Sequence, residues 1–158
     1  MSDRNAFFFS DTDLDTVLRE RESLDVFCSL HPLSLLRKGL ASMGVVPASD
    51  LRRLPSGSRI RLTGMVIFFH TPPVRTGRRI IFATLEDETA IFDLVITPEA
   101  QTRWSRLVYD SEILTVEGRL WRQGRKGLSI SVTMISAVPQ LCGTLEKVVS
   151  ELLGPIPL

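Results

Sequence analysis

Two apolar runs separated by four polar residues constrain the fold of this chain more than any other feature of its sequence. The runs extend from Ile80 to Leu85 and from Ala90 to Ile96, and residues 86–89 (Glu-Asp-Glu-Thr) connect them. Both runs are rich in β-branched and aromatic residues, which favour strands over helices. Two strands joined by so short a polar connection predict a β-hairpin. In the second run, alternation predicts one face against a core, made of Phe92, Leu94 and Ile96.

Further strands are predicted on both sides of the hairpin. A first strand starts at Ser58 and alternates polar with apolar residues, and Gly64 in its middle predicts a bulge or bend. Its expected core-facing residues are Ile60, Leu62, Val66 and Phe68. A helix is expected after Pro98, and residues 112–121 and 128–138 are expected to form the fourth and fifth strands. The order β-β-β-α-β-β predicts a mainly β fold, the five-stranded OB-fold barrel.

Helical segments are expected outside the strands. Residues 11–22, the segment from Pro32 to Gly44, and residues 144–153 each carry apolar residues at helical spacing. Pro32 suits a first helical turn, and Gly44 suits a helix end. We therefore expect a helical N-terminal extension and connector at 1–57, an OB-fold domain at 58–139, and a C-terminal helix with an apolar tail at 140–158.

The hairpin also carries a family resemblance. A basic pair, the motif F-x-x-L-E-D-x-T, an apolar strand and a proline resemble strands 2 and 3 of a nucleic-acid-binding OB domain. That domain belongs to the alpha subunit of bacterial DNA polymerase III and its error-prone relatives, in which a short HPL segment, here His31-Pro32-Leu33, leads toward it. The family usually has Thr-Gly after the acidic turn, whereas this chain has Thr89-Ala90, so we expect the turn to be built differently. The polymerase palm has no counterpart in this sequence, so the resemblance implies a binding domain and not an enzyme.

Charge and aromatic patterning narrow the class of ligand. The formal net charge is +1, so nucleic-acid binding would depend on local clusters of basic residues. Such clusters fall beside the strand 2–3 face that binds oligonucleotides in OB barrels, and aromatic residues there can stack bases. The alternative is a solvated rim of arginines with the aromatic side chains in the core. The predicted nucleic-acid-binding residues are Arg59, Arg61, Arg75, Arg78, Arg79, Phe82, Arg119, Trp121, Arg122, Arg125 and Lys126.

No catalytic residue, metal ligand or cofactor is predicted. The carboxylates of residues 86–88 fall in a hairpin turn, where Asp is favoured because it accepts hydrogen bonds from nearby backbone N–H groups. His31 and His70 lack partners at metal spacing, and His70 is expected at most to make a minor nucleic-acid contact. Cys28 and Cys142 form no CxxC motif, which predicts a reduced, cytoplasmic compartment, and Cys28 is expected to be buried.

The patterns and the resemblance together predict a small stand-alone protein that binds single-stranded DNA as an accessory to replication or repair. Two alternatives stay open. One is a protein-interaction module that docks onto a DNA polymerase or another replication protein through the barrel, Phe7–Phe9 and the helical ends, including the apolar tail at 154–158. The other is an RNA- or tRNA-binding OB domain. A membrane partner is not expected, because no apolar run approaches the ~18 residues of a membrane span.

Overall fold

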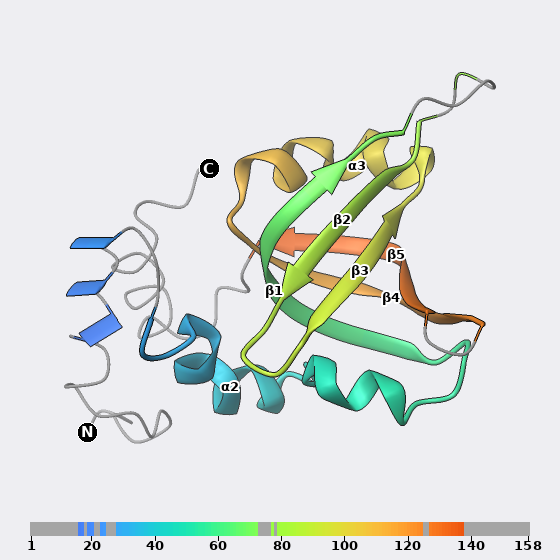
Figure 1. Ribbon diagram of the computed structural model, residues 1–158. Helices are drawn as coiled ribbons and strands as arrows, with labels where there is room; N and C mark the ends of the chain where they lie inside the picture. Colours follow the sequence, from blue (N-terminus) through green and yellow to red (C-terminus); the bar gives the residue numbers. More distant parts are fainter. Residues whose placement is uncertain are drawn as a thin grey trace, which may run out of the picture. The chain divides into compact units, whose positions relative to one another are not determined.

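A closed barrel of five strands carries the candidate site (Figure 1). The computed structural model describes residues 16–17, 19–20, 23–24, 28–72, 77, 79–124 and 127–137. The strands close in the order β1-β2-β3-β5-β4, and only the pairing of β3 with β5 is parallel among them. Their bounds are β1 (Arg59–His70), β2 (Ile81–Glu86), β3 (Ile91–Ile96), β4 (Ile113–Gln123) and β5 (Gly127–Ala137). This architecture confirms the predicted mainly β, five-stranded barrel.

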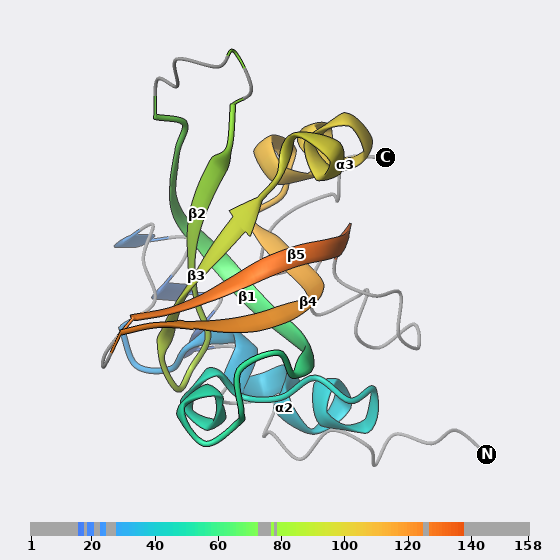
Figure 2. The same ribbon diagram turned by 90° about the vertical axis from the view of Figure 1, so that its right-hand side faces the viewer.

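Two short helices lie at opposite ends of this barrel (Figures 1 and 2). The 3₁₀ helix η1 (Ala48–Arg52) lies near the turn between β2 and β3, in the segment predicted as a connector. Helix α3 (Pro98–Asp110) follows β3, and the Thr97 side chain accepts from the N–H of Ala100 at 3.5 Å, as an N-cap does. The Gln101 side-chain amide donates to the carbonyls of Arg79, at 2.6 Å, and Ile96, at 3.0 Å. These bonds tie α3 to both strands of the hairpin.

Strand β1 serves two partners because it bends at Gly64. Residues 59–65 pair with β4, and the segment from Met65 to His70 pairs with β2. A Cβ atom at Gly64 would lie 2.7 Å from Cζ of Phe92 and 3.0 Å from Cβ of Leu85. The strand can therefore pass this close to the core only without a side chain, which confirms the predicted bend.

A bulge at Ile67 reverses the in-and-out alternation of β1. Val66 pairs with Leu85 and Phe68 pairs with Thr84, so Ile67 is the additional residue in β1. Phe68, which the alternation predicted on the core face, is instead 56% exposed. Phe69 packs against the core, with its ring centroid 4.8 Å from that of Tyr109. The prediction for Phe68 was wrong because one inserted residue shifts every later side chain to the other face.

The hairpin that dominates the sequence supplies much of the barrel core. On β3 the three predicted core residues are at most 4% exposed, and on β2 the alternate residues Ile81, Ala83 and Leu85 are at most 2% exposed. Full burial of a large aliphatic or aromatic side chain contributes about 1.5–3 kcal/mol. The residues between them, including Phe82, Thr84, Asp93 and Val95, consequently face outward.

The described residues before Val45 belong to a second compact unit. Helix α2 (Pro32–Ser42) begins after His31, whose Nδ1 accepts from the N–H of Leu33 at 3.2 Å. Gly44, at φ 75°, follows its end, and this helix confirms the prediction for that segment. Cys28 is exposed, which contradicts its predicted burial. Phe7–Phe9, most of residues 11–22, and residues 144–153 lie outside the described residues.

None of the helices in the described part of the chain combines the length and the apolar character needed to cross a membrane.

Candidate nucleic-acid interface

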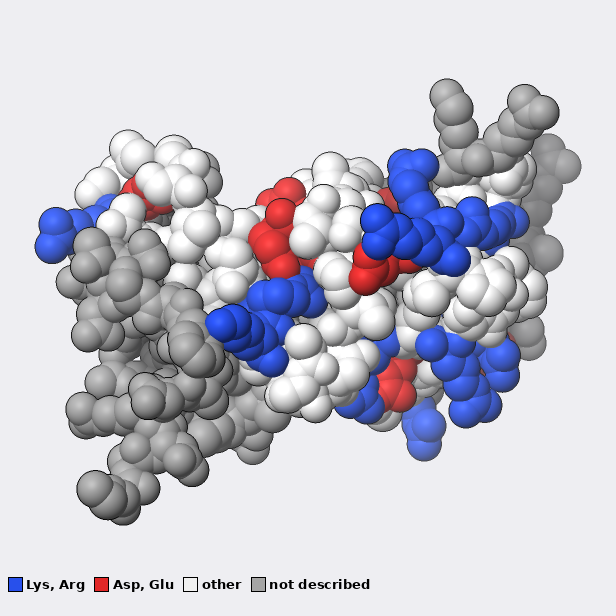
Figure 3. All heavy atoms as spheres, turned by 90° about the horizontal axis from the view of Figure 1, so that it is seen from below, with Lys and Arg blue, Asp and Glu red and all other residues white. Residues whose placement is uncertain are grey.

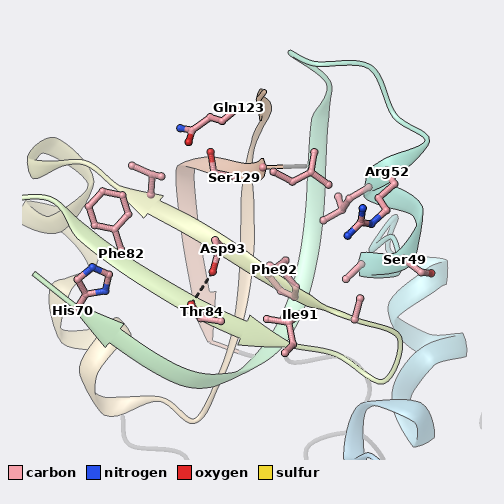
Figure 4. A pocket seen from close by; sticks show the side chains of 16 residues that line it. Ser49, Arg52, His70, Phe82, Thr84, Ile91, Phe92, Asp93, Gln123 and Ser129 are labelled. Carbon is pink, nitrogen blue, oxygen red and sulfur yellow. Dashed lines mark hydrogen bonds between the residues drawn. The ribbon is translucent and has the colours of Figure 1, made fainter. Parts of the chain in front are cut away.

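A groove of about 470 Å³ crosses the outer face of the β2–β3 hairpin (Figure 4). Strands β2 and β3 form its floor, and η1, the end of β1 and the tip of the β4–β5 hairpin form its borders. The strand register fixes an order along the floor: Phe82 pairs with Val95, Thr84 with Asp93, and Glu86 with Ile91. The groove therefore has an aromatic end at Phe82, a polar centre, and an opposite end next to η1.

Two stacked rings, His70 and Phe82, form the aromatic end, and a third ring extends the stack beyond the residues that line the groove. His70 and Phe82 are directly opposite on β1 and β2, with ring centroids 5.4 Å apart and ring planes 21° apart. Phe68 continues the stack on His70, also at 5.4 Å, with an interplanar angle of 23°. The Ile67 bulge makes this stack possible because it turns both Phe68 and His70 outward. Nearly parallel ring faces at a groove edge are a surface on which an unpaired base can stack.

The polar centre is a cross-strand pair on the groove floor. The Thr84 hydroxyl donates to Oδ1 of Asp93 at 2.7 Å, and the two residues are paired in the β2–β3 register. Gln123 and Ser129, from the β4–β5 hairpin, line the same groove (Figure 4). The side chains in this part of the groove present hydrogen-bonding groups to a ligand that lies on the groove floor.

Asp87 fixes the end of the groove next to η1. Its Oδ1 accepts from the backbone N–H of Thr89 at 2.7 Å and of Ala90 at 2.9 Å, and its Oδ2 accepts from the N–H of Ala48 at 2.8 Å. Burial acts to raise the pKa of the Asp87 carboxyl, but the hydrogen bonds from the Thr89 side chain and from the three backbone groups outweigh it, so this pKa is lowered. The predicted role of an aspartate in the hairpin turn is thus confirmed, and the same carboxylate holds η1 against the hairpin.

Arg52 is the single arginine among the described residues that line the groove, and the sequence analysis missed it. It was missed because residues 45–57 carry prolines and a Ser-Gly turn and were predicted as a connector. The adjacent basic pair Arg52-Arg53, in the segment that precedes the first strand, was the available signal. Four further groove residues were not predicted to bind nucleic acid, namely Thr84, Asp93, Gln123 and Ser129, and His70 was expected to make at most a minor contact.

Three predicted arginines lie on the outer face of β1 and β4, namely Arg59, Arg61 and Arg119, and the last two contact the protein itself. Arg59 pairs with Arg119 in the strand register, and Arg61 forms an ion pair with Glu117, with Nε 2.8 Å from Oε1. Arg119 also donates to the carbonyl of Gly57 at 3.3 Å. Figure 3, which views the molecule from below, shows Lys and Arg side chains gathered over the barrel with acidic side chains beside them.

Arg122 connects this arginine-rich side to the groove. One nitrogen of its guanidinium, Nη2, donates to the carbonyl of Arg52 at 2.6 Å and to that of Leu54 at 2.7 Å. Arg122 therefore holds the chain that follows η1. Because that chain begins at Arg52, this arrangement also fixes the backbone from which the Arg52 side chain extends.

The other predicted residues are spread around the groove. Phe82 lines it, and Arg79 is exposed just before β2. Trp121 is 50% exposed and lies opposite the groove residue Ser129 in the β4–β5 register, on the same outward face. The remaining predicted residues lie outside the described part of the chain: Arg75, Arg78, Arg125 and Lys126.

No group of three or more His, Cys, Asp or Glu side chains within the described residues is arranged to hold a metal ion. The polar groups of the groove are instead hydroxyls, an amide, an imidazole, one carboxylate and one guanidinium. Groups of these kinds can form hydrogen bonds to the bases or phosphates of a nucleic acid.

The family model of the OB-fold nucleic acid binding domain matches residues 60–138 of this chain. The chain therefore belongs to this family, and its barrel is an OB-fold nucleic-acid-binding domain. The match covers all five strands and α3.

Relatives with similar sequences are named error-prone DNA polymerases, in agreement with the resemblance of the hairpin motif. The polymerase of Symbiobacterium thermophilum is 29% identical over 117 residues, which are 74% of this chain and 11% of that protein. The polymerase of Anaeromyxobacter dehalogenans (strain 2CP-C) is 37% identical over 95 residues, 60% of this chain and 8% of that protein. This chain thus spans about a tenth of the length of the curated relatives it matches.

Among solved structures, the barrel is similar to part of asparaginyl-tRNA synthetase from Pyrococcus horikoshii, which was crystallised with asparaginyl-adenylate. The identity is 18%, the TM-score is 0.48, and the match covers 60% of this chain and 22% of that chain.

Proposed function

We propose that this OB-fold domain binds single-stranded DNA in the groove over β2 and β3, as an accessory to a DNA polymerase in replication or repair. The observation that supports this most is the stack of His70 on Phe82 at the edge of the groove. The domain would bind its ligand without catalysing a reaction on it.

Single-stranded nucleic acid fits the aromatic end of the groove better than a duplex does. In a duplex the base faces are stacked on one another, so exposed rings on a protein have no base face to contact. Unpaired bases present both faces, and each stacking contact with an aromatic side chain is worth about 1–3 kcal/mol. The stack of Phe68, His70 and Phe82 therefore supports a ligand with unpaired bases.

The charges along the groove suit a strand that is held by few phosphate contacts. Arg52 lies at the η1 end, and Arg79 is exposed where the chain enters β2, close to the aromatic end. Arg59 and Arg119, on the outer face of β1 and β4, are proposed to extend this path along the barrel. Phosphate contacts from Arg75, Arg78, Arg125 and Lys126 are proposed from the sequence alone. With a net charge of +1, the chain gains little from long-range attraction, so the affinity would depend on these local contacts.

The preference for DNA and the link to a polymerase come from the relatives. Proteins named error-prone DNA polymerases carry a related segment, and we propose that this domain supports the same class of process. A binding domain held next to a polymerase raises the local concentration of the strand without adding a catalytic group.

The test is the fluorescence anisotropy of a labelled single strand of about 20 nucleotides, which exceeds the ~4–16 nucleotides that one OB fold covers. Duplex DNA and RNA of the same sequence serve as competitors, at low and moderate salt. We expect saturable binding that weakens with salt and that single-stranded DNA competes best. The absence of binding at low salt would overturn the proposal, and RNA as the best competitor would overturn the assignment to DNA.

A matched pair of variants ties the binding to the groove. Phe82→Ala removes the ring that stacks on His70, and we expect its affinity to fall about 5- to 150-fold. Met134→Ala removes a 40% exposed apolar side chain from β5 that does not line the groove, and it should bind as the wild type does. Equal losses in both variants would place the binding elsewhere.

A further inference from the structure

Asp93 is an unexpected residue to find in a groove that binds a polyanion. Its side chain is exposed on the outer face of β3 and lines the groove at the polar centre. A carboxylate repels phosphates, and it is costly for strand binding unless it accepts hydrogen bonds from the ligand. The bases, which carry N–H groups, are the part of a single strand that can donate to it.

The carboxylate is held in one orientation. The Thr84 hydroxyl donates to its Oδ1 at 2.7 Å from the paired position on β2. A carboxylate has about four acceptor positions, and this bond uses one of them. In Figure 4 the pair lies between the aromatic end, with His70 and Phe82, and the opposite end, with Arg52.

A base that stacks at the aromatic end has its edge within reach of Asp93. Phe82 and Thr84 are two residues apart on the same face of β2, a separation of about 6.4–6.8 Å. Asp93 lies directly across from Thr84. Gln123 and Ser129 line the same part of the groove and supply further donors and acceptors around that edge.

The bases differ in what they offer to a fixed carboxylate. Guanine carries two adjacent donors on its Watson–Crick edge, N1–H and the N2 amino group, which match the two oxygens of a carboxylate. Cytosine and adenine each offer one amino group next to an acceptor nitrogen. Thymine and uracil offer N3–H between two carbonyl oxygens, which a carboxylate repels. In single strands these edges are free to be read.

We propose that Asp93, oriented by Thr84, makes the groove select guanine and reject thymine by accepting hydrogen bonds from guanine N1–H and N2–H. Thr84 is a positioning residue in this arrangement, because it acts through the Asp93 carboxylate. The inference rests on the proposed binding of single strands and adds a base preference to it. A carboxylate thus becomes a specificity determinant instead of an electrostatic defect.

The test compares three strands of about 12 nucleotides, which is within the span of one OB fold. Their sequences are alternating thymine-guanine, alternating thymine-inosine and all thymine. Inosine keeps N1–H but lacks the N2 amino group, so it removes one of the two proposed bonds and little else. A well-formed two-bond contact discriminates by about 5- to 150-fold, so we expect the affinity to fall in the order guanine, inosine, thymine, with at least about 5-fold between the first and last.

Two variants assign the preference to the pair. Asp93→Asn should bring the guanine-to-thymine affinity ratio close to one, because the amide can accept only one of the two guanine bonds and can pair with the N3–H and a carbonyl oxygen of thymine. Thr84→Val keeps the charge but removes the orienting hydroxyl, so it should reduce the ratio partially. The matched control is Asp110→Asn, which removes an exposed carboxylate paired with Arg106 on α3 and should leave the ratio unchanged.

The outcomes separate the two proposals. If none of the three strands binds the wild type at low salt, the proposed function fails and the base preference fails with it. If the strands bind with equal affinity, or if Asp93→Asn keeps the wild-type ratio, the role of Asp93 is overturned while single-strand binding stands.

Discussion

The outer face of β2 and β3 and the outer face of β1 and β4 belong to one barrel, but their side chains are engaged differently. On β2 and β3 the floor of the groove carries an aromatic stack and a Thr–Asp pair, with Arg52 at one end. On β1 and β4 arginines predominate: Arg61 contacts a carboxylate, and Arg119 and Arg122 donate to backbone carbonyls of the protein. The groove is open for a ligand, whereas much of the arginine-rich side already has protein partners.

The number of arginines in a region therefore overstates the positive charge available to a ligand. An arginine that donates to carbonyls, as Arg122 does, fixes a loop and positions what the loop carries. An arginine beside a glutamate, as Arg61 is, presents a nearly neutral pair to a phosphate. Substitutions can distinguish the residues that hold the barrel together from those that contact the single-stranded DNA.

The largest effect is expected at Asp87, which joins η1 to the hairpin and so keeps Arg52 at the groove. Asp87→Ala leaves the N–H groups of Ala48 and Ala90 without their acceptor, and we expect a loss of about 2–4 kcal/mol in the free energy of unfolding. Urea denaturation followed by tryptophan fluorescence measures it. Asp110→Ala, on the exposed face of α3, is the control and should change stability by less than about 0.5 kcal/mol.

The same carboxylate should make stability depend on acid pH. The pKa of Asp87 is lowered in the folded protein, so its contribution is fully present above the unfolded pKa of about 3.9 and is lost as pH falls through the folded pKa. Asp87→Asn should therefore show a shallower loss of stability below about pH 4 than the wild type. Hydrogen bonds from Ser29 and then Cys28 also lower the pKa of Glu20. Glu20 is present in both the wild type and the variant, so the difference between their stability–pH curves measures the contribution of Asp87. Parallel curves would contradict this role.

We expect Arg122 to stabilise the fold more than it contributes to ligand binding. Arg122→Ala removes the hydrogen bonds to the carbonyls of Arg52 and Leu54, and we expect about 1–2 kcal/mol of destabilisation, measured by thermal or urea unfolding. Arg122→Lys keeps the charge but cannot reproduce the guanidinium geometry, so it should recover little of the loss. Full recovery with lysine would indicate that charge, and not the carbonyl contacts, is what this position supplies.

We expect Arg52, in contrast, to contribute to ligand binding and little to stability. Arg52→Ala should leave stability within about 0.5 kcal/mol and reduce the dependence of log affinity on log salt by about 0.7, the value for one lost contact to a single strand. The neighbouring Arg53 is the matched control, because it forms an exposed pair with Asp50 at 3.4 Å and does not line the groove. Equal slopes for the two alanine variants would remove Arg52 from the binding site.

Local patterns in the sequence were sufficient to predict the barrel, because the alternation of Phe92, Leu94 and Ile96 and the position of Gly64 have direct consequences for burial and bending. The bulge at Ile67 left no such signal, since an inserted residue is set by how β1 meets β2. The groove was therefore only partly predictable: Phe82 could be found from its strand, but the stack with His70 and Phe68 depends on that bulge. Arg52 depends equally on a contact distant in sequence, between Asp87 and Ala48.

The smallest effects, and the most discriminating for the arginine-rich side, are expected from Arg59 and Arg61 on the same strand. Arg61→Ala breaks the ion pair between Arg61 and Glu117. Both side chains are about a third exposed, so the substitution should lower the free energy of unfolding by at most about 1 kcal/mol. Arg59→Ala removes one of two like charges directly opposite each other, Arg59 and Arg119, and should stabilise the barrel by a few tenths of a kcal/mol. Thermal unfolding at low salt should therefore show melting shifts of opposite sign, and both shifts should shrink as salt screens the charges. If Arg59→Ala destabilises instead, Arg59 holds the barrel as its neighbours do, and the arginine-rich side is structural throughout its described residues.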